Sequence, residues 1–101
     1  MKILTACANG SGTSLMLLRT VKKAMKEMGY NVTQADHTSV SEAKGTARNY
    51  DVVFTSTPFV KMFDEVKNKG GEVIGIKNVI STKEVEDKVK ASDVPKKFLN
   101  K

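Results

Sequence analysis

The sequence has few of the residues that support covalent cross-links or metal sites. Among its 101 residues are one cysteine, one histidine and no tryptophan. A single cysteine forms no internal disulfide, so folding needs no oxidising compartment. One cysteine and one histidine without a carboxylate cluster do not make a ligand set, and we therefore expect no metal.

Long hydrophobic runs are also missing. The longest apolar run, Leu15 to Leu18, is far too short to span a bilayer, so we expect no membrane-spanning segment. The residues before Cys7 resemble a lipoprotein cleavage box, but they are too few to form a signal peptide. We therefore expect a cytoplasmic protein. With 40% hydrophobic and 28% charged residues, the composition is that of one folded domain.

The charge is mostly of one sign. The formal net charge is +6 at pH 7, which would favour binding to nucleic acid, to an anionic membrane surface or to an acidic protein. The lysines are spread along the chain and do not form a single tract. A generally basic, solvated surface is the simpler interpretation, and we expect no nucleic-acid partner.

Short β-rich segments alternate four times with segments of helical periodicity. The predicted strands are Lys2–Ala6, Asn31–Asp36, Asp51–Thr55 and Glu72–Ile76. Three helices are predicted over Ser14–Met28, over Ser39–Asn49, and from Pro58 to the Gly70-Gly71 pair, the third with an apolar face of Phe59, Met62, Phe63 and Val66. A fourth helix follows Ser81, whose spacing from Glu84 matches the capping box.

This alternation predicts an α/β fold, a three-layer sandwich with a four-stranded parallel sheet and helices on both faces. We predict the strand order 2-1-3-4, a domain over residues 1–92 and a C-terminal tail over residues 93–101. Ligands of such sheets bind beyond the carboxyl ends of the strands, where the strand order reverses. For this order the crevice lies between the loops Cys7–Ser14 and Ser56–Phe59.

The first of these loops carries the chemistry. Glycines leave backbone amides open to a ligand, and the helix that follows adds unpaired N–H groups and a positive dipole end. We expect this environment to stabilise a thiolate on Cys7 and then an anionic group bonded to its sulfur. The phosphate-binding candidates are the next seven residues: Ala8, Asn9, Gly10, Ser11, Gly12, Thr13 and Ser14.

Three known loop motifs can be tested by counting. The P-loop needs a lysine, and none occurs between Cys7 and Ser14; the dinucleotide fingerprint needs a glycine where Leu15 stands. A cysteine phosphatase needs an arginine at the position of Thr13 to clamp the phosphoryl oxygens. A small cysteine phosphatase or arsenate reductase nevertheless remains the main alternative function. A basic nucleic-acid-binding module is a further alternative.

Two segments resemble a known family. Ile3 to Met16, with its Cys-x-Asn-Gly-x-Gly-Thr-Ser loop, is similar to the start of a IIB component of the bacterial phosphoenolpyruvate-dependent sugar phosphotransferase system (PTS), ascorbate/galactitol type, which has a lactose/cellobiose-IIB-like fold. Val73 to Ser81 resembles the ascorbate side of that branch.

The resemblance implies a phosphotransferase that needs no cofactor. A histidine on a IIA protein would donate a phosphoryl group to Cys7, and residues 8–14 would hold it. Cys7 would pass the group to an ascorbate-like sugar or a hexitol bound by the membrane IIC permease. The protein would then lie at the inner face of the membrane through IIC.

Two further polar residues flank the predicted crevice, and a third follows the second strand. Ser56 and Thr57 follow the third strand, so we expect them to contact the phosphoryl group; otherwise they cap the Pro58 helix. His37 follows the second strand and suits a phosphoryl relay or general base. A single polar loop histidine, however, more often has no such role.

Overall fold

A four-stranded parallel sheet forms the centre of the molecule. The computed structural model describes residues 1–7, 12–68 and 71–92. The strands lie in the order β2-β1-β3-β4, and every neighbouring pair is parallel, which confirms the predicted sheet. Their bounds are β1 Lys2–Cys7, β2 Gln34–Ser39, β3 Val52–Ser56 and β4 Glu72–Ile76.

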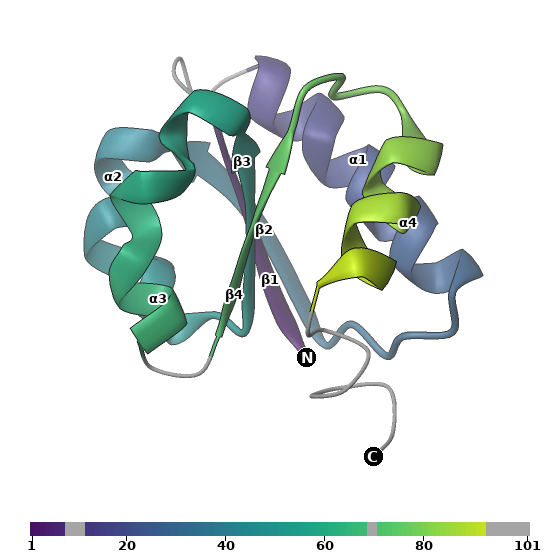
Figure 1. Cartoon of the computed structure of the whole chain (residues 1–101), viewed down its shortest axis with the longest axis horizontal. Helices are drawn as coiled ribbons and strands as arrows, with labels where there is room; N and C mark the ends of the chain where they lie inside the picture. Colours follow the sequence, from purple (N-terminus) through teal and green to yellow (C-terminus); the bar gives the residue numbers. More distant parts are fainter. Residues whose placement is uncertain (8–11, 69–70, 93–101) are drawn as a thin grey trace.

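Helices cover both faces of this sheet, as predicted (Figure 1). The two longer helices, α1 (Gly12–Glu27) and α4 (Thr82–Ala91), pack together on one face. The other face carries α2 (Val40–Thr46), α3 (Asp64–Asn68) and two 3₁₀ segments, η1 (Ala47–Asn49) and η2 (Thr57–Phe63). Among the described residues, no helix is both long enough and apolar enough to cross a membrane.

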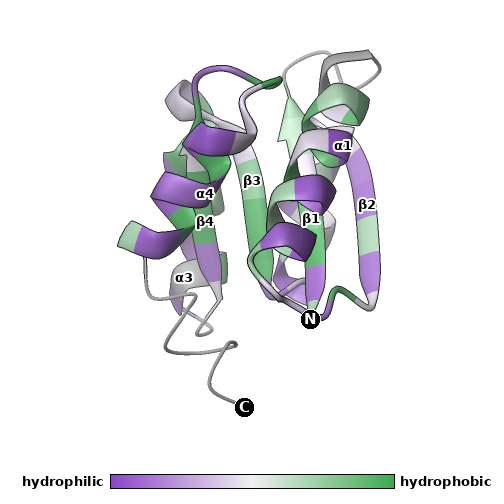
Figure 2. Ribbon diagram, turned by 90° about the vertical axis from the view of Figure 1, so that its right-hand side faces the viewer, coloured by the Kyte–Doolittle hydropathy of each residue, from purple (hydrophilic) through white to green (hydrophobic). Residues whose placement is uncertain are grey.

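Each face of the sheet has its own hydrophobic core, because the central strands β1 and β3 are covered on both sides. Ile3 of β1 and Phe54 of β3 are fully buried beneath α1 and α4, whereas their neighbours Leu4 and Val53 point to the other side. Figure 2 shows the apolar character of β3 and of the middle of β1, in contrast to the mixed edge strand β2. The central strands are thus packed on both faces, and this packing positions their last residues, Cys7 and Ser56, at the carboxyl edge of the sheet.

Strand β2 begins three residues later than predicted, at Gln34 instead of Asn31. Its register with β1 starts with Lys2 opposite Gln34. The preceding Thr33 N–H donates to the Met1 carbonyl at 2.8 Å. Strand pairing, which the sequence pattern does not contain, therefore sets this boundary. The shift places His37 inside the strand and not in the loop after it.

The segment after β3 also begins with a different type of helix from the predicted α-helix. Residues Thr57–Phe63 form a 3₁₀ helix, in which side chains three residues apart share a face. The hydrophobic core on the face that carries α2 and α3 accordingly includes Val60, Phe63 and Val66. Met62, predicted to face the core, is 37% exposed. The prediction assumed 3.6 residues per turn and was wrong for this side chain.

Candidate functional site

Cys7 is the last residue of β1, at the carboxyl edge of the sheet. Its strand, β1, lies between β2 and β3. The chain goes from β1 to β2 on one side and then crosses to β3 on the other side, so the strand order reverses between β1 and β3. The side chain points to the face covered by α1 and α4, where it joins the core cluster and is only 2% exposed. The sole cysteine of the chain therefore stands at the position where ligands bind in parallel sheets.

The thiol of Cys7 has one described hydrogen-bond partner. Ser56, the last residue of β3, donates from Oγ to Cys7 Sγ across 4.0 Å. Burial raises the pKa of the Cys7 thiol, and the Ser56 hydroxyl lowers it by a smaller amount, so the pKa lies above its ordinary value. This direction is opposite to the stabilised thiolate that the sequence predicts. That prediction depends on the backbone amides of residues 8–14, of which Ala8, Asn9, Gly10 and Ser11 lie outside the described residues.

The end of the predicted loop forms the first turn of α1. The helix begins at Gly12, so Gly12, Thr13 and Ser14 all lie at its amino end. The first N–H groups of a helix have no partner within the helix and carry the positive end of its dipole. Four residues separate Cys7 from this helix start along the chain. The turn is therefore an electropositive element at the edge where the thiol lies.

Ser14 is held by hydrogen bonds to two strands. It is fully buried, and its carbonyl oxygen accepts a hydrogen bond of 3.0 Å from the Thr5 hydroxyl of β1. Its Oγ lies 3.1 Å from Nδ1 of His37 on the edge strand β2. Thr5 and His37 are direct partners in the β1–β2 register. These contacts fix the first turn of α1 above the two strands.

The sequence placed His37 beyond β2 and did not connect it with the loop. The signal that could have done so is register: a β2 strand aligned with β1 puts its last residues beside Thr5, Ala6 and Cys7. The imidazole is exposed, although its Nδ1 lies at the buried Ser14. His37 is therefore a neighbour of the candidate site that the sequence alone did not identify as one.

The two residues after the third predicted strand take different positions. Ser56 reaches the Cys7 sulfur, as described above. Thr57 lies against β4, since a Cβ built on Gly75 would be 3.1 Å from Thr57 Cα. The structure describes no contact between Thr57 and Cys7. Next to this pair, Thr55 donates to the Ala6 carbonyl at 2.7 Å and ties β3 to the end of β1.

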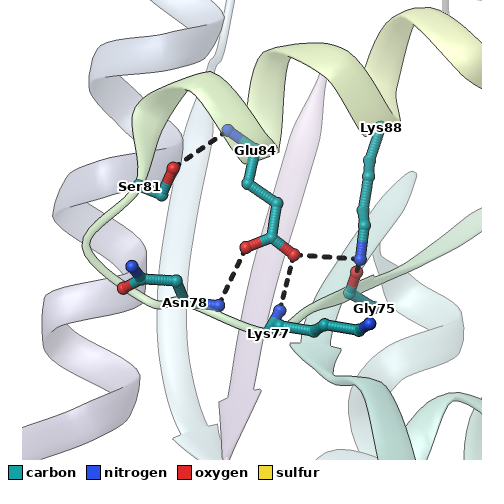
Figure 3. A network of polar contacts seen from close by, with 6 residues as sticks. All are labelled: Gly75, Lys77, Asn78, Ser81, Glu84 and Lys88. Atoms are coloured by element: carbon teal, nitrogen blue, oxygen red, sulfur yellow. Dashed lines mark hydrogen bonds and ion pairs between the residues drawn. The ribbon is translucent and has the colours of Figure 1, made fainter.

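A polar network fixes the neighbouring loop between β4 and α4 (Figure 3). Ser81 Oγ accepts from the Glu84 N–H at 3.1 Å, which is the capping contact predicted from the sequence. The Glu84 carboxylate accepts from the N–H groups of Lys77 and Asn78 at 2.7 and 2.8 Å, and pairs with Lys88 at 2.9 Å. It thus holds the loop and does not close a full capping box.

The same loop is attached to α1. Thr20 Oγ1 donates to the Val79 carbonyl at 2.6 Å, which joins the middle of α1 to the loop. The next residue, Ile80, is 65% exposed, and Met16, one turn before Thr20 on α1, is 46% exposed. The backbone of the loop after β4 is therefore held by hydrogen bonds with both α1 and α4, and Ile80 is an exposed apolar side chain on it.

The described residues contain no group of three or more histidine, cysteine, aspartate or glutamate side chains placed to hold a metal ion. The chemistry of this edge is that of a thiol, hydroxyl groups, an imidazole and a helix amino end. Such a set can hold an anion and can carry a group on sulfur.

Comparison with known proteins assigns the family. The family described as "PTS system, Lactose/Cellobiose specific IIB subunit" matches residues 2–91, nearly the whole chain. The chain belongs to this family. As a PTS IIB component it is one of the phosphotransferase components of a sugar transport system, as the resemblance predicted.

Individual relatives agree with this assignment. The ascorbate-specific PTS system EIIB component of Mycoplasma pneumoniae is 29% identical over 86 residues, which cover 85% of this chain and 87% of the relative. In structure, the chain is similar to the lactose-specific IIB component domain from Streptococcus pneumoniae, with a TM-score of 0.57. That match has 18% identity and covers 90% of this chain and 92% of the other, so it supports the fold.

Proposed function

We propose that this IIB component carries a phosphoryl group on Cys7 between a IIA donor and a sugar bound by a IIC permease. The observation that carries the proposal is the position of the only cysteine. It stands at the carboxyl end of β1, at the strand-order reversal, five residues before the amino end of α1. Membership of the IIB family supports the same role.

The first step is an in-line displacement at phosphorus. The Cys7 thiol gives its proton to solvent, and the sulfur attacks the phosphoryl group on a IIA histidine. The S–P bond forms as the N–P bond breaks, and the leaving imidazole keeps the electron pair and takes up a proton. Such a transfer depends on positioning and on charge stabilisation more than on covalent help from the protein.

Residues 8–14 are the proposed phosphate cradle: Ala8, Asn9, Gly10, Ser11, Gly12, Thr13 and Ser14. Hydrogen bonds to a charged group contribute about 1.5–3 kcal/mol each, whereas a helix dipole adds about 0.3–1 kcal/mol. A few amide contacts to the phosphoryl oxygens would therefore outweigh the dipole of α1. They would also offset the burial that raises the pKa of Cys7.

The second step passes the group to a sugar hydroxyl. The sugar oxygen attacks phosphorus, the S–P bond breaks, the hydroxyl proton goes to solvent and the Cys7 sulfur is regenerated. We propose an ascorbate-like sugar as acceptor, because the Mycoplasma pneumoniae relative is ascorbate-specific. The acceptor would be bound by IIC, which places this component in the cytoplasm at the inner membrane face.

Hydrolysis of phosphorylated Cys7 would release the phosphoryl group before its transfer to the sugar. One feature of the loop disfavours this hydrolysis. Thr13 occupies the position at which a cysteine phosphatase has its arginine. Without that guanidinium, the transition state for attack by water lacks its bidentate clamp. The carrier function is therefore favoured over a phosphatase or an arsenate reductase.

Reconstitution tests the proposal. The chain is incubated with phosphoenolpyruvate, the upstream phosphotransferase proteins and an ascorbate-type IIA protein, and its intact mass is measured. We expect one added phosphoryl group on the wild-type chain and none on Cys7→Ser or Cys7→Ala. An adduct that persists in both variants, or fast release of phosphate from p-nitrophenyl phosphate by the wild type, would refute the carrier function.

A further inference from the structure

We infer that His37 is a positioning residue for the phosphoryl site and acts through the hydroxyl group of Ser14. This inference rests on the proposed function, and it adds a residue that no part of the loop motif contains. The carrying observation is the 3.1 Å contact between His37 Nδ1 and Ser14 Oγ. Ser14 is the last residue of the proposed cradle and lies in the first turn of α1.

The contact connects two elements that the sequence separates. His37 lies on β2, at the edge of the sheet, and its strand partner Thr5 donates to the Ser14 carbonyl at 3.0 Å. Ser14 is thereby held through its backbone by β1 and through its side chain by β2. The same strand β1 ends two residues later at Cys7. Both contacts therefore contribute to the position of the helix amino end relative to the sulfur.

Because Ser14 is buried, its hydrogen bond with His37 matters for the site. Ser14 is fully buried, so its hydroxyl group needs protein partners, and a buried hydroxyl that loses one is costly. His37 is exposed on its outer side and can change partners or be replaced without opening the core. The bond can run in either direction, since Nδ1 accepts from the hydroxyl in one tautomer and donates to it in the other.

The contact with His37 orients the Ser14 hydroxyl group within the cradle. A serine hydroxyl rotates to suit its partners, so a fixed nitrogen at 3.1 Å sets where the remaining hydrogen or lone pair points. Transfer by in-line displacement is sensitive to small errors in the placement of groups around phosphorus. Removing the imidazole should therefore slow phosphoryl transfer without weakening the association with the donor protein.

Three substitutions of His37 separate this role from others. Asparagine places an amide donor and acceptor at the position of Nδ1, because both are bonded to Cγ. Glutamine places its amide one bond further out, near the position of Nε2. Leucine fills similar space with no polar atom. None of the three has an imidazole ring, so they differ chiefly in the contact with Ser14.

The test measures single-turnover phosphorylation of the chain by the phosphorylated IIA protein, over a range of donor concentrations. We expect His37→Leu and His37→Gln to lower the maximal rate by roughly three- to tenfold, the worth of one hydrogen bond. His37→Asn should restore it to within about twofold of wild type. The donor concentration for half-maximal rate should be the same in all four proteins, and thermal unfolding checks that each is folded.

Three results would overturn the inference. One is a His37→Leu variant as fast as wild type. Another is a His37→Asn variant as slow as His37→Leu, which would mean that the imidazole itself transfers a proton or a phosphoryl group. The third is a change confined to the half-maximal donor concentration, which would make His37 a docking residue. If the wild-type chain accepts no phosphoryl group at all, the proposed function fails before this inference is reached.

Discussion

Ser56→Ala is expected to reduce the thiolate form of Cys7. The Ser56 hydroxyl donates to the sulfur and so favours the charged form, whereas burial disfavours it. The 4.0 Å separation and the weak acceptor sulfur put this bond at the low end of hydrogen-bond energies, about 0.5–1 kcal/mol. Its loss should raise the pKa of Cys7 further and lower the thiolate population at neutral pH by about two- to fivefold.

The assay is a pH titration of thiolate absorbance in the ultraviolet, from which the titration of Cys7→Ala is subtracted, because that variant has no thiol and keeps the absorbance of the two tyrosines. Ser56→Thr keeps the hydroxyl and should titrate close to wild type. Thr57→Ala removes the neighbouring hydroxyl, for which no contact with the sulfur is described, and should leave the titration of Cys7 unchanged. If Ser56→Ala titrates like the wild type, or at lower pH, the hydroxyl does not stabilise the thiolate and this reasoning is refuted.

Three further predictions concern stability. Glu84→Gln should lower the unfolding free energy by about 1–3 kcal/mol in urea titrations, because the carboxylate accepts two backbone N–H groups and pairs with Lys88; an unchanged midpoint would contradict this. Burial would raise the pKa of Glu84, but those hydrogen bonds outweigh it and lower the pKa, so the difference between wild type and Glu84→Gln should be largest at neutral pH and shrink as acid protonates the carboxylate; a difference that grows in acid would refute the assignment. Gly75→Ala should cost about 1–3 kcal/mol, measured by thermal unfolding, because the new Cβ would lie 2.7 Å from Val60 Cγ2 and 3.1 Å from Thr57 Cα; Gly45→Ala, where a Cβ meets no atom within 4 Å, is the control and should not destabilise the chain.

The sheet was predictable from the sequence because its signals are local. Continuous apolar runs such as Val52 to Phe54 mark strands covered on both faces, and alternation with helices limits the topology to a few right-handed arrangements. The predicted order 2-1-3-4 is the observed one. The capping contact between Ser81 and Glu84 was likewise readable from spacing alone.

Features that depend on tertiary pairing were not predictable. The start of β2 is set by its register with β1, and the exposure of Met62 by a change from 3.6 to 3.0 residues per turn. The same register brings His37 beside Ser14, a contact that joins residues 23 positions apart. The loop motif indicated the family and predicts Cys7 as the reactive residue, but the described partners of the thiol and of Ser14 come from strands elsewhere in the chain.

Phosphorus NMR of the phosphorylated chain tests the central claim most directly, because a phosphoryl group on sulfur and one on imidazole nitrogen have different environments and coupling partners. The account predicts one protein-bound resonance of the S–P type, assigned to Cys7 and absent from Cys7→Ala. A resonance of the N–P type that disappears in His37→Asn but remains in Cys7→Ala would contradict it, and would make the histidine the carrier.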